Sequence, residues 1–242
     1  MSFLRDAART LRPPAGDRHG PLMPLLVALT VLSGVVDAAS YLELGHVFVA
    51  NMTGNIIFLG FALAGAGGLS PVSSLIALGA FLLGALAGGW LGARYHAHRG
   101  HVLRAANATQ VVLIAAAVLL ASVATVPPDR ATRYALIALL ALALGAQNAA
   151  AQRLSVPDLT TTVLTRTLTG LASESSLVGG EGSQLGRRAV AIAAMLLGAL
   201  TGGLLALHVS ITAALGVALA IVSCTGLAAH LLSRSGGVWT RG

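Results

Sequence analysis

One apolar stretch of this chain carries side chains that could bind a solute or carry a proton. Residues 34–62 read GVVDAASYLELGHVFVANMTGNIIFLGFA and include Asp37, Asn51, Thr53 and Asn55. A helix that faces lipid does not tolerate such a set, because polar and ionisable groups at bilayer depth are costly and usually face a bundle interior or a pathway. The carboxylate could bind a cation or a proton there, and the amides and the hydroxyl could bind a polar solute.

A diverged copy of this stretch follows at residues 145–172, which read GAQNAAAQRLSVPDLTTTVLTRTLTGLA. Asp37 aligns with Asn148, and the run TGN at 53–55 aligns with TRT at 165–167 after one inserted residue. The second copy therefore repeats the pattern of polar groups in an apolar setting.

The likeness continues further along the chain. Residues 82–89 read LLGALAGG and residues 196–203 read LLGALTGG, at an offset of 114. Three matches in the same order, at nearly the same offset, indicate an internal duplication. We expect repeat one to span about 22–126 and repeat two about 133–233.

The composition is that of a chain that crosses a membrane several times. The chain has 242 residues, of which 56% are hydrophobic and 10% are charged, whereas a soluble domain has about 25% charged residues. The net charge is +7, and every basic residue is an arginine. The arginines lie at the ends of apolar segments, which is the positive-inside pattern of membrane proteins, so we expect no nucleic-acid binding.

Eight apolar segments can be marked, and two of them are poor candidates for a continuous span of about 20 apolar residues. The second segment, 53–68, is too short, and the sixth, 159–178, is dense in hydroxyl groups. If both enter the membrane and return to the same side, twelve arginines lie inside and two outside. The positive-inside rule favours this arrangement over eight full spans with parallel repeats, which is the alternative.

The predicted fold class is thus all-α. It is a polytopic membrane helix bundle with two internal repeats, inverted relative to each other, each with three full spans plus one short re-entrant or broken helix. We expect a cytoplasmic tail at 1–21, a single transmembrane domain at 22–233 and a cytoplasmic tail at 234–242. The expected location is the cell (inner) membrane.

Inverted repeats with broken helices bind solutes near the midplane, at the interface between the repeats. We therefore expect a solute to contact residues from both copies. These residues are Asp37, Asn51, Thr53, Gly54, Asn55, Asn148, Thr165 and Arg166.

Each of these residues also has a purely structural interpretation. Asp37 could hydrogen-bond a helix break or pair with Arg166. Asn51, Thr53 and Asn55 could cap the start of a helix. Arg166 could extend along the bundle to the cytoplasmic interface.

Glycines at four-residue spacing predict close contacts between helices, since small residues let membrane helices approach. They are Gly84, Gly88, Gly92, Gly198 and Gly202. In the simplest arrangement the spans 72–94 and 189–207 cross each other.

Other chemistries find little support in the residues. His96, His98 and His101 match no common zinc spacing, so we expect no metal site. The chain has no lysine, which excludes a phosphate-binding loop of the G-x-x-x-x-G-K-[ST] type and a lysine Schiff base to a cofactor. We expect no cofactor and no catalytic residue.

Two motifs carry a resemblance to a known family. Residues 36–60, VDAASYLELGHVFVANMTGNIIFLG, closely resemble the signature of the YoaK-like bacterial membrane proteins, which are catalogued as a domain of unknown function. GAQNAAAQRL at 145–154 resembles the second signature of that family, although Arg166 stands where a glycine after threonine is usual. The resemblance covers residues 22–233 and implies a bacterial multi-pass membrane protein without naming a solute.

We interpret the chain as a small-solute transporter or channel, with the lipid bilayer and a small solute or proton as partners. One alternative is an intramembrane enzyme acting on lipid or peptide, in which Asp37 and the pair Glu43 and His46, on one helix face, supply acid and base groups. Another is a structural or assembly protein of the membrane without transport. The sequence leaves a homo-oligomer open.

Overall fold

A computed structural model describes residues 2–14, 16–95, 98–125, 128–157, 159, 164–173, 184–234 and 238–240. Across these residues the chain is helical. The helices are α1 (Ser2–Leu11), α2 (Leu22–Glu43), α3 (Met52–Leu63), α4 (Pro71–Arg94), α5 (Arg99–Val123), α6 (Arg130–Leu154), α7 (Leu164–Ser173), α8 (Leu185–His208) and α9 (Ile211–Ser233), followed by a 3-10 turn at Val238–Thr240.

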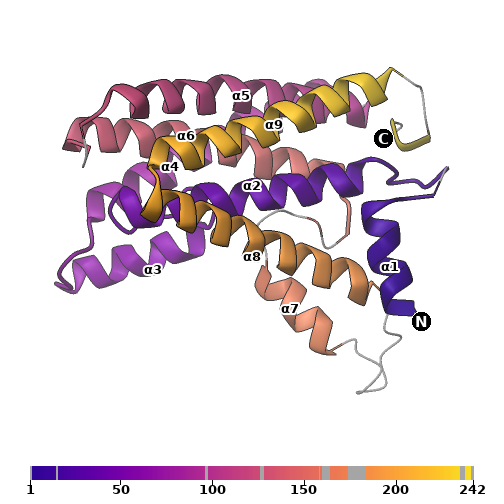
Figure 1. The fold of residues 1–242 in the computed structure, drawn as a ribbon, viewed down its shortest axis with the longest axis horizontal. Coiled ribbons are helices and arrows are strands. Elements are labelled where there is room, and N and C mark those ends of the chain that lie inside the picture. The colour runs from indigo at the N-terminus through magenta and orange to yellow at the C-terminus, as the bar shows by residue number, and fades with distance from the viewer. Residues whose placement is uncertain are drawn as a thin grey trace.

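Six of the described helices, α2, α4, α5, α6, α8 and α9, are long and apolar enough to cross a membrane. The short helices α3 and α7 correspond to the second and sixth apolar segments. In Figure 1 the six long helices run side by side, α3 lies along one half of the bundle and α7 along the other. The prediction of an all-α membrane bundle is therefore confirmed, and six candidate spans and two short helices agree with it.

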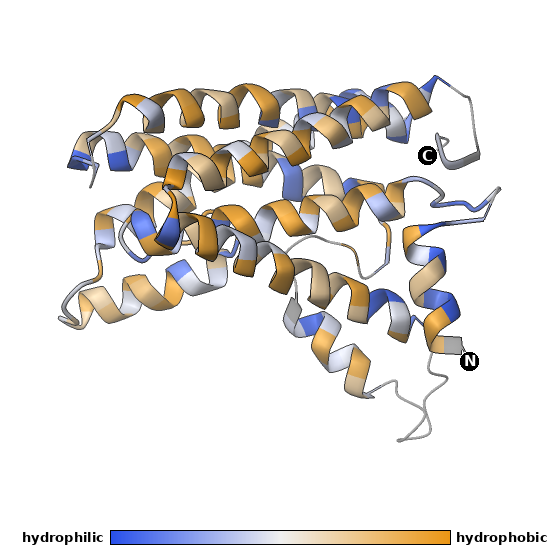
Figure 2. Ribbon diagram, in the orientation of Figure 1, coloured by the Kyte–Doolittle hydropathy of each residue, from blue (hydrophilic) through white to orange (hydrophobic). Residues whose placement is uncertain are grey.

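The two ends of the bundle differ in polarity. Both chain termini lie at the same end (Figure 1). Figure 2 shows hydrophobic residues along the long helices and hydrophilic residues gathered mainly at the end that holds the termini. The predicted tails are partly structured, because the first contains α1 and the second contains Trp239, which is buried near Gly20 and Gly100.

Glycines mark the two most extensive helix contacts, which are α4 with α6 and α8 with α2. A Cβ at Gly88 would lie 2.5 Å from the carbonyl oxygen of Ala146, and a Cβ at Gly202 would collide with that of Val35. Gly84 and Gly92 face α6, and Gly198 faces α2, in the same way. The expectation that spans 72–94 and 189–207 cross each other is therefore wrong.

Each of these spans packs instead on the first long helix of the other half of the chain, α4 on α6 and α8 on α2. The contact between Gly84 and Leu142 has a counterpart between Gly198 and Val31. Gly198 follows Gly84 by 114 positions, and Leu142 follows Val31 by 111 positions. This exchange of partners is consistent with two inverted repeats whose interface runs through the middle of the bundle. In this arrangement α2 and α6 are the most buried of the six candidate spans. Most residues of the other four are not buried within the bundle.

Candidate functional site

Asp37 holds the backbone of the segment that turns back into the bundle. Helix α2 ends at Glu43, and residues 44–51 return along it to the start of α3. Oδ1 of Asp37 accepts hydrogen bonds from the N–H groups of Val49 and Ala50, each at 2.8 Å, and Oδ2 accepts one from the side-chain amide of Asn51. The carboxylate thus takes up three donors of a non-helical segment that would otherwise be costly in a membrane.

Asn55 fixes the same segment from its other side. Its Oδ1 accepts a hydrogen bond from Phe48 N at 2.9 Å, and its Nδ2 donates one to Phe48 O at 2.6 Å. The side chain is fully buried. Gly54 allows the approach, since a Cβ there would lie 2.6 Å from the Phe48 ring. These two predicted site residues therefore have structural partners.

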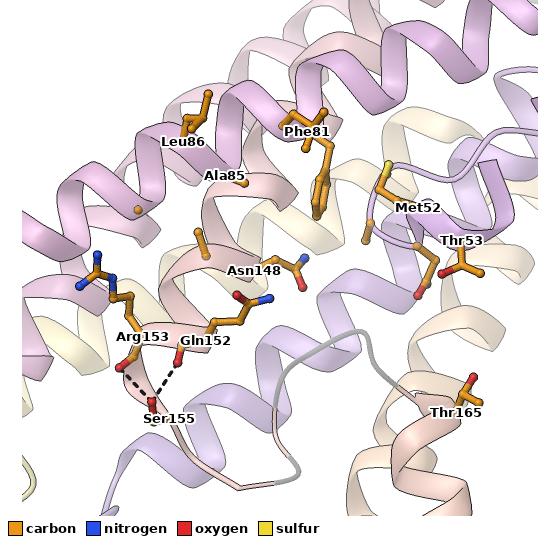
Figure 3. A pocket seen from close by; sticks show the side chains of 15 residues that line it. Met52, Thr53, Phe81, Ala85, Leu86, Asn148, Gln152, Arg153, Ser155 and Thr165 are labelled. Carbon is orange, nitrogen blue, oxygen red and sulfur yellow. Dashed lines mark hydrogen bonds between the residues drawn. The ribbon is translucent and has the colours of Figure 1, made fainter. Parts of the chain in front are cut away.

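A cavity of about 1240 Å³ lies between the start of α3, the middle of α4, the second half of α6 and the start of α7. Its wall includes Asn51 and Thr53 from the first half of the chain and Asn148 and Thr165 from the second half. The structure thus brings together four of the eight predicted site residues, at a junction between the two predicted repeats. Figure 3 shows the amide of Asn148 pointing across the cavity toward the side of α3.

The described wall of the cavity carries little charge. It contains no acidic side chain, and Arg153 near the end of α6 is its one charged member. Gln152 and Ser155 add neutral hydrogen-bonding groups, and apolar side chains of α4 such as Phe81 and Leu86 form the opposite wall. The cavity can therefore hydrogen-bond a polar molecule and enclose its apolar part.

The other predicted site residues lie away from this space. Asp37 stands behind the wall, where it is bonded to Ala50 and Asn51. Arg166 is exposed on α7, and the structure does not bring it to the Asp37 carboxylate. Gly54 and Asn55 support the loop rather than line the cavity.

One interpretation of acid and base groups needs correction. Glu43 is the last residue of α2, and His46 follows it with a left-handed φ of 57°, so these residues do not share a helix face as expected. The His46 ring instead packs edge-on against Tyr41, with centroids 5.1 Å apart.

Histidines at the other end of the bundle form no metal site in the described part of the chain. The rings of His98 and His101 stack at 4.0 Å, and His96 lies outside the described residues. Among the described residues, no group of three His, Cys, Asp or Glu side chains could hold a metal ion.

Sequence reasoning missed a buried polar link between three helices. Gln147 of α6 donates a hydrogen bond to Ser33 Oγ of α2 at 2.9 Å, and it accepts one from Gln110 Nε2 of α5 at 2.7 Å. All three side chains are buried. The available signal was Gln147 itself, one position before Asn148 in the second motif.

Comparisons with known proteins agree with this architecture. Residues 25–228 match the family described as "Protein of unknown function (DUF1275)". The UPF0700 transmembrane protein YoaK of Bacillus subtilis (strain 168) is 35% identical over 154 residues, which is 63% of this chain and 66% of that relative. The chain thus spans just under two thirds of the relative's length. No solved structure matches.

Proposed function

This chain belongs to the DUF1275 family of multi-pass membrane proteins, and we propose that it is a transporter or channel for a small polar solute. One observation carries the proposal. Polar side chains from both copies line one cavity at the place where the two short helices begin. Groups of this kind at membrane depth are costly unless they face a pathway or a binding site.

The charge of the cavity supports a class of solute. A cation would gain little from a wall whose described residues include Arg153 and no carboxylate. Asp37 offers such a cation no direct contact, because it does not line the cavity and its oxygens face Val49, Ala50 and Asn51. The solute we propose is therefore an uncharged or anionic molecule with hydroxyl, amide or carboxylate groups.

The proposed orientation follows from the arginines. The end of the bundle that holds both termini lies in the cytoplasm, since arginines gather on the inner side of bacterial membranes. The membrane is the bacterial inner membrane. Helix α3 then enters the membrane from outside and α7 enters from inside. The cavity between them can therefore open to the solute from one side of the membrane at a time.

Access of water to the cavity can be tested without knowing the solute. In a Cys224→Ala background, Thr53→Cys and Thr165→Cys are treated with a charged methanethiosulfonate reagent in proteoliposomes. We expect both to react, because both positions line the cavity. Thr201→Cys on α8, an exposed position away from the cavity, is the matched control that lipid should shield. Failure of both cavity positions to react would contradict a water-filled pathway.

Flux tests the function itself. Proteoliposomes shrunk in a panel of small polyols, amides and monocarboxylates re-swell as the solute enters, and light scattering follows the change. We expect faster re-swelling for one class of solute with the wild type than with Asn148→Leu, while Thr201→Val behaves as the wild type. Equal rates for all three proteins and for empty liposomes, across the panel, would refute the proposal.

A further inference from the structure

Helix α1 lies across the ends of the spans. Figure 1 shows it running across the direction of α2 and beside the start of α8, at the end of the bundle that holds both termini. It rests on the start of α8, where a Cβ at Gly186 would lie 2.5 Å from Ala7 N. Asp6 Oδ2 accepts a hydrogen bond from Arg187 N at 3.0 Å. Helix α1 therefore packs beside the first turn of a candidate span.

One face of α1 is apolar and largely exposed in the described chain. Leu4 is 74% exposed and Leu11 is 51% exposed. With Ala8, which is also exposed, these residues stand at positions i, i+4 and i+7, so they form a single stripe along the helix. Leucines in such a stripe are costly in water, and α1 lies beside the first turn of α8, where that candidate span begins.

The rest of the exposed surface of α1 is basic. Arg5 and Arg9 are exposed on the polar side of the helix, and Arg12 follows its end. Asp6 is the one acidic residue of α1, and its carboxylate already accepts a bond from α8. A helix with an apolar stripe flanked by arginines, at the end of a bundle of candidate spans, is typical of interfacial helices that bind anionic lipid.

We propose that α1 is such a helix. Leu4, Ala8 and Leu11 insert between the lipids of the adjacent leaflet, and the arginines bind anionic phospholipid headgroups. The lipid-bound helix then holds the start of α8 through Asp6 and the close contact at Gly186. Gly170 of α7 lies against Arg188 of α8, so the contact between α1 and α8 also affects the position of α7, the short helix that lines the cavity. The proposal does not depend on transport.

The depth of α1 in the bilayer can be measured on the full chain. In a Cys224→Ala background, Leu4→Cys or Leu11→Cys carries an environment-sensitive fluorophore, and Arg9→Cys is the matched control on the polar side. The proteins are reconstituted in phosphatidylcholine alone or mixed with phosphatidylglycerol. We expect blue-shifted emission at positions 4 and 11 that brominated lipids quench, and water-like emission at position 9.

Charge provides the second arm of the test. Phosphatidylglycerol should increase quenching at position 4, and replacing Arg5 and Arg12 by Gln should reduce this increase. Water-like emission at positions 4 and 11 would overturn the proposal. Blue-shifted emission that brominated lipids do not quench would overturn it as well, since protein, such as a second copy of this chain, would then cover the stripe.

Discussion

The carboxylate of Asp37 and the backbone N–H of Ala50 are joined by a hydrogen bond of 2.8 Å across 13 positions of the chain. Ala50 is part of the cavity wall, and Asp37 is not. The buried carboxylate therefore shapes the cavity from behind, by fixing the segment that precedes α3. This relationship favours the structural interpretation of Asp37, as the acceptor that holds the broken segment, over that of a solute ligand.

Removal of the Asp37 carboxylate should destabilise the protein. Asp37→Ala leaves the N–H groups of Val49 and Ala50 and the amide of Asn51 without their acceptor, so we expect a loss of about 3 kcal/mol in the free energy of unfolding. Asp37→Asn should be milder, because its Oδ1 can still accept from both N–H groups. Thermal unfolding in detergent, followed by size-exclusion chromatography, measures the difference. Equal midpoints for Asp37→Ala and the wild type would contradict this role.

Asn55 should tolerate no change that removes either half of its amide. Asn55→Asp keeps the acceptor for Phe48 N but turns a carboxylate oxygen toward Phe48 O, which the native Nδ2 binds. We expect a loss of roughly 2 kcal/mol or more, since the new charge is buried with Phe48 N as its donor and with one oxygen facing the Phe48 carbonyl. Thr53→Ala, an exposed neighbour on α3, is the control and should change stability by less than about 0.5 kcal/mol. Comparable losses for the two variants would argue against the Asn55 pairing.

The sequence predicted the elements well and their partners poorly. Polar residues at positions 37, 51 and 55 mark the broken segment, because such groups need partners within an apolar region. The glycine spacing on α4 predicts a close neighbour, but it carries no information on which helix fills that role, so the contact with α6 needed the structure. The failure at Glu43 and His46 had a signal, since Gly45 with φ of 91° follows the C-cap of α2, and glycine there ends a helix.

Bulk at Gly88 should separate α4 from α6. Because a Cβ there would lie 2.5 Å from Ala146 O, we expect Gly88→Ala to lower the unfolding midpoint and Gly88→Leu to lower the folded yield sharply. Gly79 on the same helix is exposed and has open space around it, so Gly79→Ala and Gly79→Leu are the matched controls. Fluorescence-detected size-exclusion chromatography measures the yield. Unchanged yields for both Gly88 variants would remove the close-packing argument.

Two loop positions separate the two topologies. With six spans and two re-entrant helices, residue 67 between α3 and α4 lies outside and residue 95 after α4 lies in the cytoplasm. With eight spans the two positions exchange sides. In a Cys224→Ala background, we expect an impermeant thiol reagent to label Gly67→Cys in intact cells and Tyr95→Cys only after lysis. Labelling of position 95 in intact cells would contradict the six-span arrangement.

A cluster around Arg99 joins the first residues of the chain to the bundle. Its guanidinium donates hydrogen bonds to Arg18 O at 3.2 Å and to Leu154 O at the end of α6. Its Nη2 also lies 3.3 Å from His19 Nδ1. Since Nη2 is a donor, Nδ1 must accept, and the His19 ring is therefore neutral in this arrangement.

Acid should weaken this cluster through His19. Burial lowers the pKa of His19 below its usual 6.5, and the charges of Arg99, Arg187 and Arg18 lower it further, against the opposing effect of Asp17. The unfolded chain thus binds a proton more readily than the folded one, so stability is full above pH 6.5 and falls as the pH drops through that value toward the lower folded pKa. His19→Gln keeps a polar side chain without the titration. We expect its unfolding midpoint to fall less than that of the wild type between pH 7.5 and pH 5.5, at roughly one pH unit either side of the usual pKa. Parallel pH profiles for the two proteins would show that His19 is not the group responsible.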